Sequence, residues 1–244
     1  MFNNIIKFQA PQNYLGLKSQ LPEPIKINIP EWYKKLKHTV LKRTVKGCMP
    51  FLDTLTTGYL LKLPLDMYIE HNVYNNGARE SGTRTGLMDS GEFMNDLNIN
   101  KGLEIHPIHQ LEGSPYIQKN KTLPVGKILN PWTIKTPPGY SCLFVPPLNN
   151  TDDRFSIIPG IVDTDMFPAE INFPYIINGD KYPVIKTTIE MGTPYAQIIP
   201  FKRESWKMKI SELKESSSLQ SKFSVCLKLF NNYKSRWWSK KSWR

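Results

Sequence analysis

The C-terminal end of the chain interleaves aromatic and basic side chains, a composition that could bind a polyanion. Tryptophan and arginine side chains can stack on nucleic-acid bases while lysines neutralise phosphates. After Glu215 the sequence contains no acidic residue. The candidate residues for contact with nucleic acid or a partner are Arg236, Trp237, Trp238, Lys240, Lys241 and Trp243.

The same composition fits three other roles for the tail. It suits an anionic membrane surface, and it suits docking onto an acidic partner protein with the tryptophans as buried anchors. The tail could instead pack against its own domain. Most of the net charge of +11 lies in this tail, so the basic isoelectric point says nothing about the partners of the preceding residues.

His106 and His109 could supply half of a metal site. The chain has four histidines, and the other two are His38 and His71. The cysteines at positions 48, 142 and 226 form no closely spaced pair. A protein metal site usually needs three or four such ligands. We therefore expect no metal site and no cofactor on these residues.

Six short runs between residues 128 and 201 predict β-strands. Each run is rich in β-branched or aromatic residues and is bounded by Pro, Gly, Asn or Asp. Short strands at close spacing favour an antiparallel barrel or sandwich over alternating helices and strands. The predicted fold class is therefore mainly β. The predicted strands span residues 128–135, 140–145, 155–162, 170–177, 184–190 and 195–201, after two β-like runs at 59–63 and 67–69.

The predicted β domain spans residues 47–204, with a long loop or weak hairpin at about 75–126. Residues 1–46 are predicted to form an N-terminal arm and a helix from Pro30 to Lys46, because proline suits the first helical position. Residues 205–244 are predicted to form a helical, basic tail. Its two helices are expected at 204–215 and 219–233, where apolar residues recur every three or four positions.

Three strings in the β region resemble the core of the deoxyuridine-triphosphatase (dUTPase) and dCTP-deaminase superfamily. Residues 136–141 (TPPGYS) resemble the family's "P-x-GY" entry into a strand. Residues 160–165 (GIVDTD), followed by Glu170, resemble its "GVIDxDYRGE" motif with one extra residue. Residues 192–200 (GTPYAQIIP) are similar to "GxRIAQLI". The order and spacing of these strings imply a dUTPase-like β-barrel.

This resemblance implies a trimer that holds a deoxynucleotide between subunits. Asp163 would then activate a water for attack on the α-phosphate, since a carboxylate beside a neutral water can act as a general base. Mg²⁺ would be needed if the chain is such a pyrophosphatase. The other candidate ligand-binding residues are Asn149, Asn150, Asp165, Phe167 and Gln197.

The chain departs from the pattern of these enzymes where phosphates are bound. A basic "RSS" turn is replaced by residues 146–150 (PPLNN), although charge-assisted contacts normally hold a triphosphate. Arg154 could substitute, and the glycine-rich C-terminal lid is absent. Asp163 and Asp165 could instead form a tight turn by accepting backbone hydrogen bonds. Gln197 could be a buried amide satisfied by the backbone.

The whole chain also resembles an uncharacterised family of tailed phages, particularly phages of marine bacteria. The shared strings stand at residues 50–59, 136–149 and 192–206. The preferred interpretation is an oligomeric, non-catalytic binding or assembly protein of a phage, with phage structural proteins as possible partners. Three alternatives stay open: a virion component such as a head decoration or tail part, a divergent deoxynucleoside triphosphate pyrophosphatase, and nucleic-acid binding through the tail.

The sequence also predicts where the protein works. No stretch has the roughly 18 apolar residues that a membrane helix needs, and the first ten residues do not resemble a secretory signal. We therefore expect no transmembrane segment, and a location in the host cytoplasm or the virion. A hydrophobic content of 40% is too high for a disordered chain.

Overall fold

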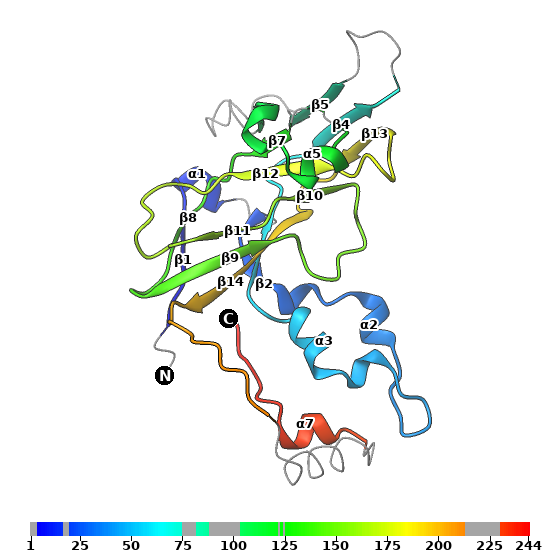
Figure 1. Cartoon of the computed structure of the whole chain (residues 1–244), viewed down its shortest axis with the longest axis vertical. Coiled ribbons are helices and arrows are strands. Elements are labelled where there is room, and N and C mark those ends of the chain that lie inside the picture. The colour runs from blue at the N-terminus through cyan, green and yellow to red at the C-terminus, as the bar shows by residue number, and fades with distance from the viewer. Residues whose placement is uncertain are drawn as a thin grey trace.

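The computed structural model describes residues 4–16, 20–74, 82–87, 103–121, 123, 125–212 and 230–244. Strands make up 31% and helices 19%, and the strand pairs are antiparallel. The predicted mainly-β class is therefore confirmed. The strands form four separate sheets, and the described residues contain no closed barrel. In Figure 1 the sheets lie above three short helices, α2 (Glu31–Lys35), α3 (Met49–Thr54) and α7 (Asn232–Arg236).

The five-stranded sheet brings together the three strings that resemble the dUTPase core. Strand β14 lies at its centre, with Ile198 opposite Phe144 on one side and Tyr59 on the other. Residues 136–141 lead into β9, residues 160–165 include β11, and residues 192–200 include most of β14. The strands, in sheet order, are β11 (Gly160–Val162), β9 (Tyr140–Val145), β14 (Pro194–Lys202), β3 (Tyr59–Lys62) and β2 (Glu23–Pro24).

Three smaller sheets surround it. The four-stranded sheet contains β10 (Phe155–Ile157), β12 (Phe173–Ile177), β7 (Val125–Ile128) and β6 (Leu103–His106). The three-stranded sheet contains β13 (Val184–Ile189), β4 (Met67–Asn72) and β5 (Gly82–Leu87). The N-terminal β1 (Lys7–Gln9) pairs with β8 (Thr133–Lys135).

One apolar core joins all four sheets. Its buried side chains come from strands of each sheet, including Ile134 of β8, Phe173 of β12 and Ile69 of β4. The Phe173 ring lies 5.4 Å from the rings of both Phe144 and Tyr195, which packs β12 against the β9–β14 pair. Each such side chain contributes about 1.5–3 kcal/mol when it is fully buried. The core therefore holds in place the strands that carry the three sequence strings.

The helix predicted for residues 30–46 is much shorter in the structure, where α2 ends at Lys35. Val40 and Leu41, which were expected on its apolar side, are 61% and 98% exposed. Thr39 Oγ1 and His38 Nδ1 accept hydrogen bonds from backbone N–H groups, of Lys42 and Thr44 respectively. Such local side-chain bonds compete with helical ones. A 3₁₀ turn, η3 (Val45–Gly47), follows.

The predicted helical tail is not confirmed. Residues 204–212 form no helix or strand, and their side chains are exposed, so no packing stabilises a helix of that length, which is marginal in water by itself. The second predicted helix, 219–233, lies mostly outside the described residues. Only α7 is helical in the last fifteen residues of the chain.

The segment predicted as a long loop or weak hairpin contains regular structure. Strand β5 pairs with β4, and β6 pairs with β7. The remaining short helical elements are α1 (Gln12–Leu15), η2 (Ile25–Asn28), η4 (Ile108–Leu111) and α5 (Pro115–Lys119). Strand β6 alternates apolar and polar residues, but a run of four residues is short for a prediction from periodicity.

Gly58 generates a stability prediction, since it has φ +84° and a Cβ there would lie 2.0 Å from the Ile198 carbonyl oxygen. Gly58→Ala should lower the free energy of unfolding by about 3 kcal/mol, from left-handed strain and a backbone clash together. Gly113→Ala is the matched control, with φ +76° and open space around it, and should cost only about 1 kcal/mol. Urea unfolding measures both, and equal losses would contradict the close approach.

Candidate functional site

The acidic turn closes directly after β11. The Asp163 carbonyl oxygen accepts hydrogen bonds from the backbone N–H groups of Met166 and Phe167, at 3.0 and 2.9 Å, which makes a tight turn. Ser141 Oγ donates to Asp163 Oδ1 at 2.6 Å, and the Gly139 N–H donates to Asp165 Oδ2 at 2.8 Å. The turn is therefore fixed against the start of β9.

Arg203, which follows β14, pairs with both carboxylates of this turn. Its guanidinium binds Asp165 through two hydrogen bonds, one of them 2.8 Å from Nη1 to Oδ1. Nη1 also lies 3.4 Å from Asp163 Oδ1. The Asp165 side chain is only 6% exposed, whereas that of Asp163 is 63% exposed. A bidentate pair of this kind is strong and geometrically specific, so Asp165 serves as the structural counter-ion of Arg203.

The electrostatics of the turn follow from this pairing. The hydrogen bonds from Arg203 hold the pKa of Asp165 well below its usual range, and the Gly139 N–H lowers it further, while burial opposes both. Asp165 in turn raises the pKa of Arg203. A general base works best with a pKa near the operating pH. Asp165 is therefore a poor base, and Asp163 has a fixed positive charge beside it.

Gln197 lies in the middle of β14 and is fully buried. Its Oε1 accepts from the Leu148 N–H at 2.9 Å, and its Nε2 donates to the Thr57 carbonyl oxygen at 2.8 Å. The amide joins the loop after β9 to the segment after α3. Both ends of the amide are occupied by backbone, which is the arrangement that a structural amide requires.

The other candidate ligand residues also make internal contacts. Asn149 has φ +60° and its amide donates to Thr54 Oγ1. The Asn150 side chain bonds the backbone N–H and carbonyl oxygen of Asp152. Phe167 is 39% exposed, and its carbonyl oxygen accepts from Lys135 Nζ. In the described structure, these contacts organise loops.

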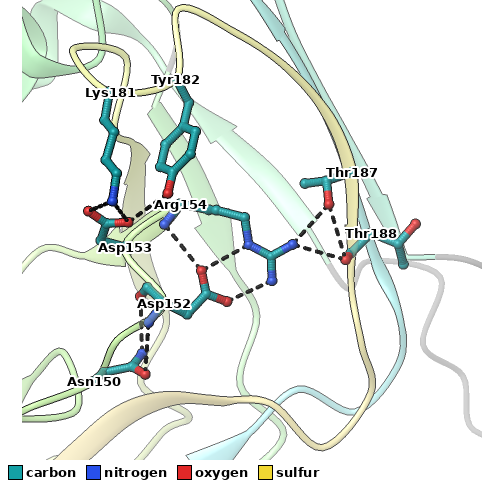
Figure 2. A network of polar contacts seen from close by, with 8 residues as sticks. All are labelled: Asn150, Asp152, Asp153, Arg154, Lys181, Tyr182, Thr187 and Thr188. Atoms are coloured by element: carbon teal, nitrogen blue, oxygen red, sulfur yellow. Dashed lines mark hydrogen bonds and ion pairs between the residues drawn. The ribbon is translucent and has the colours of Figure 1, made fainter.

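Arg154, the possible substitute for the missing phosphate-binding arginine, belongs to a polar network (Figure 2). Its Nε and Nη2 donate to the Asp152 carboxylate at 2.9 and 2.7 Å, and its Nη1 donates to Thr187 Oγ1 of β13 at 2.9 Å. These bonds from Arg154 lower the pKa of Asp152. The guanidinium therefore ties the loop before β10 to β13, and its charge is paired with Asp152.

The neighbouring Asp153 completes this network. Its carboxylate accepts hydrogen bonds from Lys181 Nζ at 3.0 Å and from the Tyr182 hydroxyl at 2.8 Å. In Figure 2 the two aspartates point in different directions, Asp152 toward Arg154 and Asp153 toward the segment before β13. Together they anchor the three-stranded sheet, and no charge in the network is left for a ligand phosphate.

The predicted site residues form two groups in one chain. Asp163 and Asp165 lie at the start of β9, next to Ser141, while Gln197 stands opposite Val145 at its end. Ser141 and Val145 are four positions apart on an antiparallel strand, so their Cα atoms are roughly 14 Å apart at about 3.4 Å per residue. A nucleotide site that uses both groups is therefore not assembled as one cluster within the chain.

The tail folds back onto its own chain. Trp238 Nε1 donates to both carboxylate oxygens of Asp53 at 3.1 Å, and Lys241 Nζ donates to the same carboxylate at 2.6 Å. The Trp243 ring packs edge-on against Tyr59, with centroids 5.9 Å apart. Three of the six predicted contact residues therefore bind the protein itself. Arg236, Trp237 and Lys240 are exposed.

The described residues offer no metal centre. They contain no group of three or more His, Cys, Asp or Glu side chains that could hold a metal ion. His106 Nδ1 instead lies 2.6 Å from Gln110 Oε1. None of the described helices is long and apolar enough to cross a membrane.

Comparison with known proteins supplies no family. No protein-family description and no curated protein matches this chain. The resemblance to dUTPases and to the phage family therefore rests on the sequence strings alone.

Sequence analysis missed Arg203 and Asp53, which organise the site. Both lie inside strings noted for other reasons, Arg203 in residues 192–206 and Asp53 in residues 50–59. The signal for Arg203 was a basic residue directly after a strand, in a chain whose expected basic turn was missing. Its partners could not be read from the sequence, because they depend on the register of β14 against β9.

The Arg203–Asp165 pair predicts a pH-dependent stability difference. The folded-state pKa of Asp165 is depressed, so its contribution is complete above the unfolded pKa of about 3.9 and is lost as the pH falls below it. Asp165→Asn should be clearly less stable than wild type at pH 7, and the gap should narrow in acid. Urea unfolding at several pH values measures this gap.

Asp163→Asn is the control for this pair. Its carboxylate is 63% exposed and more distant from Arg203, so its replacement should change stability less. An equal loss in both variants, or a gap for Asp165→Asn that stays constant with pH, would contradict the assigned pairing.

Proposed function

We propose that this chain is a non-catalytic assembly protein of a phage, built on a dUTPase-like β fold, that associates with copies of itself. The main support for this proposal is the exposure of apolar side chains in the segment that follows β14, residues 203–212, which we name the arm. Trp206, Met208 and Ile210 of the arm are 87%, 83% and 85% exposed. Large apolar side chains presented together in this way mark interaction surfaces.

The spacing of these residues fits a strand that lacks a partner. The arm forms neither helix nor strand within the chain, and if it pairs as a strand, side chains at every second position share one face. Lys207 and Lys209 alternate with them on the opposite face. Burying each of the three apolar side chains would contribute about 1.5–3 kcal/mol, which is enough to drive association.

The free edge of β11 is the surface that suits this arm. β11 ends the five-stranded sheet, and an edge strand can accept a further strand through its backbone. Three exposed apolar side chains lie at this edge and its turn: Ile161 at 64%, Met166 at 76% and Phe167 at 39%. In Figure 1 the arm runs from the end of β14 toward α7, away from the sheet. The acceptor we propose is therefore β11 of a second copy.

The contacts at the candidate site support a non-catalytic role over the pyrophosphatase alternative. Asp163 is bonded to Ser141 and lies beside Arg203. Gln197, Asn149 and Arg154 bond other parts of the chain. A triphosphate needs cationic or backbone donors that are free to bind it. The resemblance to the phage family supports the setting, and mass spectrometry of purified particles would decide whether the protein is a virion component.

The arm predicts a variant that stays folded but dissociates. Wild type should show a mass above that of one chain in light scattering, falling as the protein is diluted. The triple variant Trp206→Ser, Met208→Ser, Ile210→Ser should have the mass of one chain with unchanged thermal unfolding of the monomer, because those side chains are at least 83% exposed. Lys207→Ser with Lys209→Ser is the control in the same segment and should still associate.

Mixing variants tests the proposed pairing. Ile161→Lys should break the β11 acceptor and, like the arm variant, should be monomeric alone. The Ile161→Lys chain keeps an intact arm, and the arm-variant chain keeps an intact β11 edge. A mixture of the two should therefore form a heterodimer. A wild-type protein that is monomeric at every concentration, or a mixture that never forms the pair, would refute the proposal.

A further inference from the structure

A basic pocket lies between the N-terminal helical segment and the tail, and neither the arm nor β11 is among its described lining residues. Its volume is about 740 Å³, within the range of about 300–1,000 Å³ typical of ligand pockets. None of its described lining residues is acidic. Residues far apart in sequence come together here, including the lysines Lys34, Lys35, Lys37, Lys46 and Lys234.

Only Lys34 of these five lysines has an ion-pair partner among the described residues, since it pairs with Glu31 at 2.7 Å. Lys46 donates to the Lys34 carbonyl oxygen at 2.7 Å, which carries no negative charge. The ammonium groups of Lys35, Lys37 and Lys234 likewise have no ion-pair partner in the described part of the chain. Like charges around one concavity repel each other and raise the local concentration of anions. An anionic ligand would relieve that repulsion.

The pocket also contains a fixed aromatic pair. The rings of His38 and Phe230 stack with centroids 4.9 Å apart and planes 15° from parallel. The backbone N–H of Thr44 donates to His38 Nδ1 at 2.9 Å. A Cβ on Gly47 would lie 2.2 Å from the His38 ring, so glycine permits this position. Phe230 remains 37% exposed and offers part of its ring to a ligand.

We propose that this pocket binds a single-stranded nucleic acid, with Lys35, Lys37 and Lys234 on its phosphates and Phe230 against a base. Positively charged grooves with aromatic side chains are how proteins bind single strands without reading sequence. A duplex keeps its bases stacked and could use only the lysines. A membrane surface would need exposed apolar side chains, but the lining residues Leu36, Met49 and Leu52 are buried or half-buried. The proposal does not depend on self-association.

The test is fluorescence anisotropy of a short labelled oligothymidylate with the full chain across a salt series. The triple variant Lys35→Ala, Lys37→Ala, Lys234→Ala should bind at least tenfold more weakly. Its slope of log affinity against log salt should be shallower by about 2, since each single-strand phosphate contact contributes about 0.7. Phe230→Leu should weaken binding about tenfold with an unchanged slope, and Phe230→Tyr should restore it, because stacking needs an aromatic face.

Matched controls separate the pocket from general charge. The variant Lys7→Ala, Lys26→Ala, Lys119→Ala removes the same charge from exposed lysines elsewhere and should bind like wild type. Equal weakening by both triple variants would overturn the proposal, as would Phe230→Leu binding as tightly as wild type. Duplex DNA and anionic lipid vesicles serve as competing ligands, and a pocket variant that loses only these while keeping the single strand would also overturn it.

Discussion

Strand β14 pairs with β9 on one side and with β3 on the other, and the other functional features take their positions from this double pairing. It places Gln197 in the interior, where one amide holds the loops after β9 and after α3. It also places Arg203 one residue beyond the end of the strand, against the acidic turn. The arm then leaves from this anchored point. A shift of one residue in this register would turn the Gln197 side chain to the other face of the sheet.

Electrostatic compensation inside the chain supports the proposed non-catalytic role of the motif that resembles a catalytic one. Asp165 and Asp53 each have a cationic or indole N–H partner from a distant segment, and Asp152 is paired with Arg154 of its own loop. An ion pair that is already satisfied gains little from a ligand, and breaking it leaves an uncompensated charge. The lysines of the basic pocket are the opposite case, because four of the five have no carboxylate partner among the described residues. Charge that the fold leaves unneutralised is therefore a better guide to binding than acidic motifs alone.

The sequence predicted the strands better than the helices, although the predicted strands 128–135 and 155–162 are each divided between two strands of different sheets. Runs such as residues 140–145 and 184–190 are dense in β-branched and aromatic residues, and β9 and β13 appear there, because local pattern and core packing agree. Residues 30–46 have a helical pattern, yet Leu41 has no surface to pack against and the helix stops at Lys35. The partners of Arg203, Asp53 and His38 are all long-range or shaped by turns, so no local pattern could reveal them. The tail's docking on Asp53 was one of several open alternatives, and only three-dimensional contacts distinguish them.

Amide hydrogen exchange of residues 203–212 measures directly whether the arm holds two copies of the protein together. The measurement compares the intact protein at a series of concentrations that spans the transition in mass. We expect the arm to exchange rapidly in the dilute protein, and to become protected together with β11 at the concentrations where the mass rises. Rapid, concentration-independent exchange of the arm in a protein that nevertheless associates would contradict the claim, because another surface would then hold the copies together.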